Sequence, residues 1–199
     1  MMKQFFAILV LFSLFSAISY ANGLPPDQLT RNTANQVLSI LRENHGITHN
    51  EAQIQQLVDE QVLPYFDFQR MTQLAMGRNW RRATPTQQEE LVSQFRKLLV
   101  RTYSSALKSY RNQTITYLPF HMAPEDTDAL VKTQINQPGQ QPVPVDYSLE
   151  KTGQGWKVYD IAVDGVSLVT NYRSSFNMEI QRNGVEGLIT ALTKKNQAS

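Results

Sequence analysis

The sequence predicts an α+β protein with helices packed against an antiparallel sheet. Apolar residues recur at helical spacing in the first half of the chain, most clearly over residues 84–110. The spacing then changes to strict alternation in four segments between residues 114 and 164. The turn segments "NQPGQQP" and "TGQG" separate the later ones, and tight turns join sequential strands in an antiparallel meander.

Three helices are expected before the longest one. The first carries Leu29, Val37, Leu38 and Leu41 at helical spacing. Asn50 can cap the second helix, which Pro64 ends, and Asp67 can cap a short third helix that closes at Gly77.

The segment "ATPTQQEELVSQFRKLLVRTYSSALKSY" gives the strongest helix prediction. Thr84 is placed as an N-cap, Pro85 suits the first turn, and Gln87 completes a capping box. The helix should run for about 25 residues. Its apolar stripe comprises Leu91, Phe95, Leu98, Leu99, Thr102, Ala106, Leu107 and Tyr110.

Four strands should follow, near residues 114–121, 128–136, 142–151 and 155–164. Asp164-Gly165 then ends the last strand, and Ser167 is placed to cap a helix over residues 168–182. Asn183-Gly184 should separate it from a final helix over residues 185–194.

The N-terminus has the order of a cleavable secretory signal peptide over residues 1–21. Lys3 precedes an apolar run from Phe5 to Ile18, and Ser19-Tyr20-Ala21 forms a small-x-small cleavage site. The run is shorter than the roughly 20 residues of a membrane span. We therefore expect an exported protein in which residues 22–199 form a single domain.

Composition excludes several classes of function. The chain has no cysteine, which removes disulfides, thiolate metal sites and a cysteine nucleophile. Its 19 basic and 17 acidic residues nearly balance, so no nucleic-acid partner is expected. No glycine-rich phosphate loop or G-x-S-x-G motif occurs. His45 and His49 have zinc-compatible spacing but fall in an expected loop, so we predict no metal.

Asp160 leaves two interpretations open. It could pair with a buried tyrosine as the acid–base site of an isomerase-like cavity enzyme. It could instead bond the backbone or Arg173 at a structural corner, where Asp164-Gly165 turns the chain into the next helix. The corner interpretation requires no catalysis.

Three segments resemble the MlaC family of periplasmic phospholipid-binding proteins, also called toluene-tolerance proteins. They are "VLPYFDFQRMTQLAMGRNWRRATPTQQEELVSQF", "VYDIAVDGVSLVTNYR" and "GVEGLITAL". The A-T-P-x-Q helix start and the Y-D-x-x-x-D-G-V-S corner carry the resemblance, which spans roughly residues 28–195. It implies a curved four-stranded antiparallel sheet and helices around an apolar cavity, as in nuclear-transport-factor-like folds.

The resemblance also implies a function. The expected protein is a periplasmic carrier of diacyl phospholipid, without cofactor or enzymatic activity, that helps to maintain the lipid asymmetry of the outer membrane. Its implied partners are an outer-membrane lipoprotein–porin complex and an inner-membrane ABC-type transporter complex with a membrane-anchored substrate-binding subunit. A cavity enzyme and a protein-binding module with a filled core remain the alternatives.

Strand alternation and the long helix's stripe predict which residues line the cavity. The expected lining comprises Leu74, Phe95, Leu98, Leu99, Tyr103, Leu107, Tyr117, Val131, Ile135, Val145, Tyr147, Leu149, Val158, Val166 and Phe176.

Overall fold

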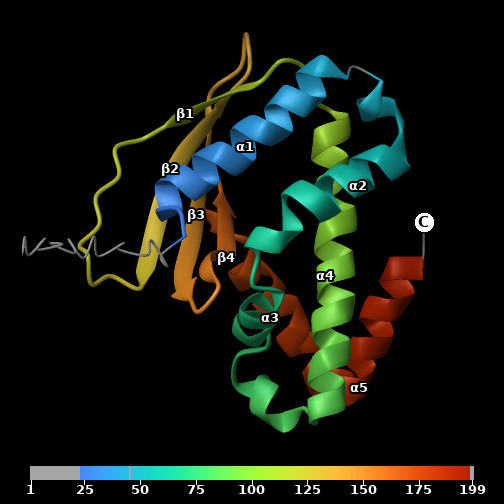
Figure 1. Cartoon of the computed structure of the whole chain (residues 1–199). Helices are drawn as coiled ribbons and strands as arrows, with labels where there is room; N and C mark the ends of the chain where they lie inside the picture. Colours follow the sequence, from blue (N-terminus) through green and yellow to red (C-terminus); the bar gives the residue numbers. More distant parts are fainter. Residues whose placement is uncertain (1–22, 45, 198–199) are drawn as a thin grey trace, which may run out of the picture.

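The computed structural model describes residues 23–44 and 46–197, so the predicted signal peptide lies outside the described residues. An open antiparallel sheet forms one side of the molecule, and helices cover one of its faces (Figure 1). This is the expected α+β architecture. No helix within residues 23–44 and 46–197 is both long enough and apolar enough to cross a membrane.

The helices before the sheet begin where the sequence predicts them. Asn50 and Asp67 accept hydrogen bonds from the N–H groups three residues later, and Thr84 and Gln87 form the complete capping box. The α-helices are α1 (Pro26–Glu43), α2 (Glu51–Gln61), α3 (Phe68–Met76) and α4 (Pro85–Lys108). Short 3₁₀ turns connect them: η1 (Ile47–His49), η2 (Leu63–Tyr65) and η3 (Gly77–Arg82).

The sheet has five strands in chain order, each antiparallel to its neighbour. They are β1 (Thr114–Tyr117), β2 (Asp128–Asn136), β3 (Val143–Thr152), β4 (Gly155–Val163) and β5 (Val166–Ser167).

Two details of the sheet differ from the prediction. The two-residue strand β5 adds a fifth strand, because Asp164 and Gly165 both have positive φ (50° and 76°) and fold the chain back on β4. Strand β1 ends at Tyr117 rather than at residue 121, since Pro119 has no N–H to continue the ladder.

A bulge bends the sheet where β3 pairs with β4. Ser148 lies opposite Asp160 and Leu149 lies opposite Val158, so Tyr159 is the extra residue on β4. A bulge increases local twist and bends the strand that carries it.

The C-terminal helical region α5 (Leu168–Gln197) is interrupted as predicted. Gly184 has φ 71° and ψ −174°, which divides the region into two helices. Figure 1 shows the second helix lying beside α4.

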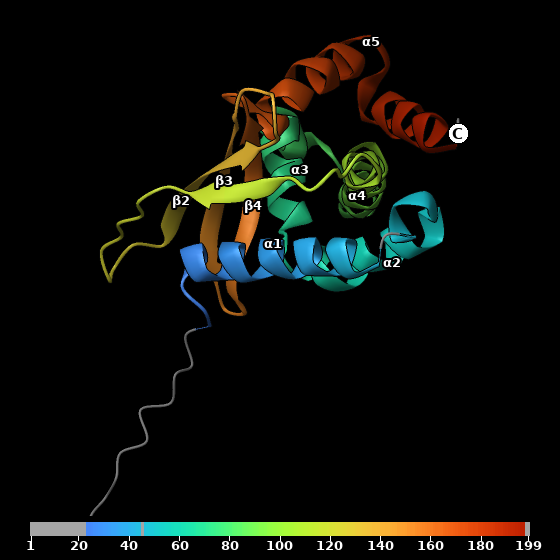
Figure 2. The ribbon, with the colours of Figure 1, turned by 90° about the horizontal axis from the view of Figure 1, so that it is seen from above.

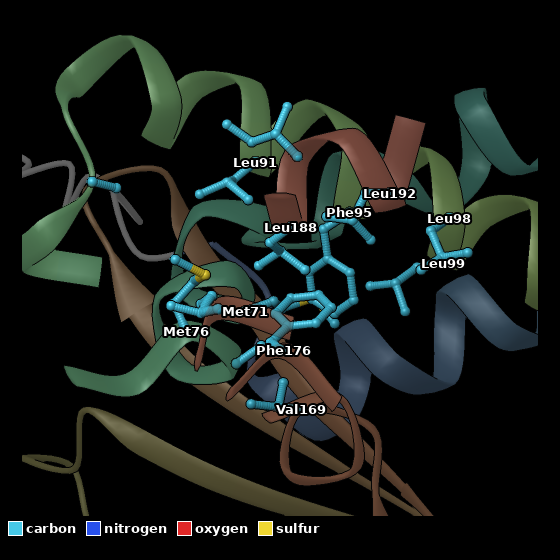
Figure 3. Packing of buried hydrophobic residues seen from close by; sticks show 14 residues of the cluster. Met71, Met76, Leu91, Phe95, Leu98, Leu99, Val169, Phe176, Leu188 and Leu192 are labelled. Atoms are coloured by element: carbon cyan, nitrogen blue, oxygen red, sulfur yellow. The ribbon is translucent and has the colours of Figure 1, made fainter. Parts of the chain in front are cut away.

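The described residues form three clusters of buried apolar side chains, one of which lies between α1 and α2 and consists of Val37, Leu41, Ile47, Ile54 and Leu57. Helices α3, α4 and α5 enclose the largest core, in which the rings of Phe95 and Phe176 meet edge to face with centroids 5.0 Å apart (Figure 3). A second core lies between the N-terminal end of α1 and the sheet. It consists of Leu29, Ala129, Val131, Leu149, Trp156 and Val158.

Candidate functional site

Two apolar pockets lie between the filled cores. We name them by the helix that contributes most to each wall. The α1 pocket has a volume of about 400 Å³ and is lined by Leu29, Thr30, Thr33, Ala34, Val37, Leu38, Leu41, Val62, Tyr65, Phe66, Ala106, Leu107, Tyr110, Gln113, Ile115, Ile135, Tyr147, Val158 and Ile161. The α4 pocket has a volume of about 620 Å³ and is lined by Val37, Val58, Val62, Leu63, Phe66, Phe68, Met71, Leu99, Val100, Tyr103, Ser104, Ala106, Leu107, Ile135, Val143, Val145, Ile161, Val163, Val166, Leu168 and Asn171.

The two pockets adjoin each other. Seven side chains contribute to both walls: Val37, Val62, Phe66, Ala106, Leu107, Ile135 and Ile161. Each volume falls within the range of about 300–1,000 Å³ that is usual for small-molecule sites. An elongated apolar ligand, or one with two apolar arms, suits such a pair of pockets.

Strands and helices, with different sequence periods, build these walls together. Strand β3 presents Val143, Val145 and Tyr147 on one face because side chains alternate along a strand. Helix α1 contributes Val37 and Leu41, four residues apart on one face. Seen from above, α1 passes across the strands while α4 is viewed nearly along its axis, so the two helices border different sides of the same space (Figure 2).

Eight of the predicted lining residues lie along these pockets. They are Leu99, Tyr103, Leu107, Ile135, Val145, Tyr147, Val158 and Val166. They come from α4, β2, β3, β4 and β5, which the fold brings together at one end of the sheet.

The other seven predicted residues lie elsewhere. Phe95, Leu98 and Phe176 are buried in the α3–α4–α5 core, and Leu74 packs against it. Val131 and Leu149 belong to the core between α1 and the sheet. The Tyr117 hydroxyl lies 3.4 Å from the Arg31 carbonyl oxygen and 3.3 Å from Asn35 Oδ1, and the Arg31 guanidinium lies 4.0 Å from its ring centroid.

Much of the wall was not predicted from the sequence. Helix α1 supplies Thr33, Ala34 and Val37, and the α2–α3 connection supplies Val62 and Phe66. The apolar stripe of α1 is visible in the sequence, but its direction across the sheet is not. Ser104 was missed because it is a polar residue between Val100 and Leu107 on the wall of the α4 pocket.

Polar side chains are the minority in both walls, and those of the α1 pocket are Thr30, Thr33, Tyr65, Tyr110, Gln113 and Tyr147. Burial raises the pKa of Tyr147 to about 12, although the phenol still borders the α1 pocket and is not fully covered by protein. In the α4 pocket the polar side chains are Tyr103, Ser104 and Asn171. Burial, and to a lesser extent the neighbouring Tyr172, raises the pKa of Tyr103 as well. These phenols are therefore neutral at physiological pH.

Asp160 lies on β4, three residues before the end of the strand, and outside both pocket walls. Its Oδ2 accepts a hydrogen bond from Ser167 Oγ at 2.5 Å, and its Oδ1 accepts from the N–H groups of Ile161 (2.9 Å) and Val169 (3.1 Å). Ser167 Oγ in turn accepts from the N–H of Thr170 and caps α5. The carboxylate thus ties strand to helix, as the corner interpretation requires.

Within residues 23–44 and 46–197, no group of three or more His, Asp or Glu side chains is arranged to hold a metal ion.

Comparison with known proteins places this geometry in a family. The profile described as MlaC protein matches residues 31–194. Toluene tolerance protein ttg2D of Pseudomonas putida is 28% identical over 200 residues, covering 96% of this chain and 92% of that protein. The intermembrane phospholipid transport system binding protein MlaC of Haemophilus influenzae is 23% identical over 197 residues, with the same coverage of both proteins.

A solved structure shares both sequence and fold with this chain. It is the phospholipid-binding protein from Ralstonia solanacearum in complex with a phospholipid, 40% identical, with a TM-score of 0.81. The match covers 87% of this chain and 98% of that one. The family profile spans the whole sheet and most of the helices, and on this evidence the chain belongs to the MlaC family.

Proposed function

We propose that this protein binds a diacyl phospholipid and carries it across the periplasm between complexes of the outer and inner membranes. The observation that carries the proposal is the pair of adjoining apolar pockets, whose walls share seven side chains. The Ralstonia protein of the same fold is in complex with a phospholipid. Two pockets that meet suit two acyl chains joined at one glycerol.

The energetics favour a carrier that encloses the tails. Each methylene removed from water contributes about 0.8 kcal/mol, so exposed acyl chains would oppose passage through an aqueous compartment. A bilayer offers the tails nearly the same burial as the pockets do. Transfer in either direction can therefore be close to neutral, and the membrane complexes must set its direction.

The proposed route fits the N-terminal sequence. Residues 1–21 have the pattern of a cleavable signal peptide, which would deliver the mature chain to the periplasm. The proposed partners are an outer-membrane lipoprotein–porin complex and an inner-membrane ABC-type transporter complex with a membrane-anchored substrate-binding subunit. The mature chain should begin at Asn22, and the intact mass of periplasmic protein tests this; a retained leader would contradict the export step.

A catalytic role has less support. The enzyme alternative needs a carboxylate within reach of a buried phenol in the cavity. Asp160 is instead held by Ser167 and by two backbone N–H groups at the corner. We therefore favour a carrier over a cavity enzyme, and the open volume of the pockets favours a carrier over a module with a filled core.

Native mass spectrometry of gently purified protein tests the proposal. We expect near one diacyl phospholipid per chain, with mixed headgroups because the net charge of the chain is small. Protein expressed with its leader should carry lipid acquired in the cell envelope. Recovery of lipid-free protein alone, after a preparation that preserves known lipid complexes, would contradict the carrier proposal.

A further inference from the structure

The polar side chains of the α4 pocket all come from helices. Tyr103 and Ser104 come from α4 and Asn171 comes from the first turns of α5, whereas the sheet side presents valine and isoleucine. Polar groups in an otherwise apolar wall are the ones that can bind a polar part of a ligand.

Two of these three residues reach solvent at the edge of the pocket. Tyr103 is 39% exposed and Asn171 is exposed, as is Val166, another residue of the wall, at 59%. Ser104 is only 9% exposed and lies one step deeper. The order from solvent inward is thus an exposed phenol and amide, a buried hydroxyl, and then hydrocarbon.

Ser104 is the unusual member of the group. Its Oγ is buried and has no hydrogen-bond partner among the described residues. A serine in a helix commonly bonds the carbonyl four residues earlier, but this hydroxyl does not. Leaving a buried hydroxyl unpaired is costly, so a ligand that pairs with it gains specificity.

We infer that the Ser104 hydroxyl donates a hydrogen bond to an acyl ester carbonyl of the bound lipid, with Asn171 as a second donor nearer solvent. The inference rests on the proposed function and adds the side chain that recognises the ester linkage of the diacyl lipid. A serine rotates between three staggered positions about one bond, so the hydroxyl can turn toward the pocket that the residue lines. The glycerol then lies at the level of Ser104, with the tails inside and the headgroup outside.

An ester–ether comparison tests this inference directly. Protein stripped of lipid is titrated with dioleoyl phosphatidylglycerol and with its diether counterpart, which has the same headgroup and chain lengths but no carbonyl oxygens. The wild-type protein should bind the ester lipid about three- to tenfold more tightly. Ser104→Ala should abolish that preference by weakening only ester binding, and Ser104→Thr, which keeps the hydroxyl, should retain it. Asn171→Ala should reduce the preference in part.

Stability measurements separate a positioning role from damage to the fold. Lipid-free Ser104→Ala should melt no lower than the wild type, because the change removes an unpaired buried hydroxyl. The ester lipid should then raise its melting temperature less than it raises that of the wild type. Equal binding of both lipids by the wild-type protein, or equal weakening of both by Ser104→Ala, would overturn the inference while leaving the carrier proposal intact. Failure of the wild-type protein to bind either lipid would instead overturn the carrier proposal.

Discussion

Val131 and Ile135 lie on the same face of β2, four residues apart, yet they have different surroundings. Val131 is 2% exposed and packs in the core with Leu29 and Leu149. Ile135 lines both the α1 pocket and the α4 pocket. One strand therefore runs from a filled region into an open one without a change of face.

This pair makes a matched test of the cavity. Ile135→Trp should place an indole in space proposed for an acyl chain, so bound lipid per folded chain should fall several-fold with little loss of stability. Val131→Trp overpacks a filled core and should cost roughly 1–3 kcal/mol or more. At roughly 2–4 °C per kcal/mol, that cost appears as a clear drop in melting temperature. The measurements are melting temperature and phosphorus per chain.

The opposite pattern would argue against an open cavity. If Ile135→Trp lowered the melting temperature as much as Val131→Trp and kept its lipid, the pockets would not be the place where the tails bind.

These two positions also show how far sequence reasoning reaches. Alternation along β2 correctly assigns Val131 and Ile135 to one face, because side-chain direction is a local property of a strand. What lies opposite that face depends on the path of α1, which local sequence does not determine. The caps at Asn50, Asp67 and Thr84 were predictable for the same local reason. Phe95 was misplaced because an apolar stripe looks alike whether it meets a neighbouring helix or an empty pocket.

Asp160 should matter for stability and not for lipid binding. Asp160→Asn replaces a charged acceptor that holds Ser167 Oγ and the Val169 N–H, so we expect a loss of about 1–3 kcal/mol. Lipid affinity should stay within a few-fold of the wild type. Asp164→Asn is the matched control, because it removes the same charge at a turn position with φ 50° that asparagine tolerates. Lipid turnover by the wild-type protein that vanished in Asp160→Asn would reinstate the enzyme interpretation.

Gly184 should be intolerant of a side chain for backbone reasons alone. Its φ of 71° and ψ of −174° fall in a region that only glycine occupies readily, and a Cβ there would meet no atom within 4 Å. Gly184→Ala should therefore cost about 1–3 kcal/mol without any steric clash. Chemical denaturation measures that cost as a shift of the midpoint.

Gly153→Ala provides the control for this change. Gly153 also has free space around it, but it does not have a positive φ. Alanine there should be neutral or slightly stabilising, since it restricts the unfolded chain. Equal shifts of the midpoint for Gly184→Ala and Gly153→Ala would mean that residue 184 can adopt another backbone conformation without loss of stability.

Tyr147 should contribute to a loss of stability at alkaline pH. Burial raises its pKa to about 12, above the value of about 10 expected in the unfolded chain, because the pocket disfavours the phenolate. The folded state thus holds the proton more tightly, so this contribution is fully present below pH 10 and is lost as the pH rises from about 10 to 12.

Tyr147→Phe should show a shallower decline of unfolding free energy across that window. Tyr65→Phe, which removes a hydroxyl from a residue 36% exposed, serves as the control for the loss of a phenol. A slope that Tyr147→Phe left unchanged would show that this phenol titrates alike in the folded and unfolded chains, and that the pocket wall around it is wetter than the structure indicates.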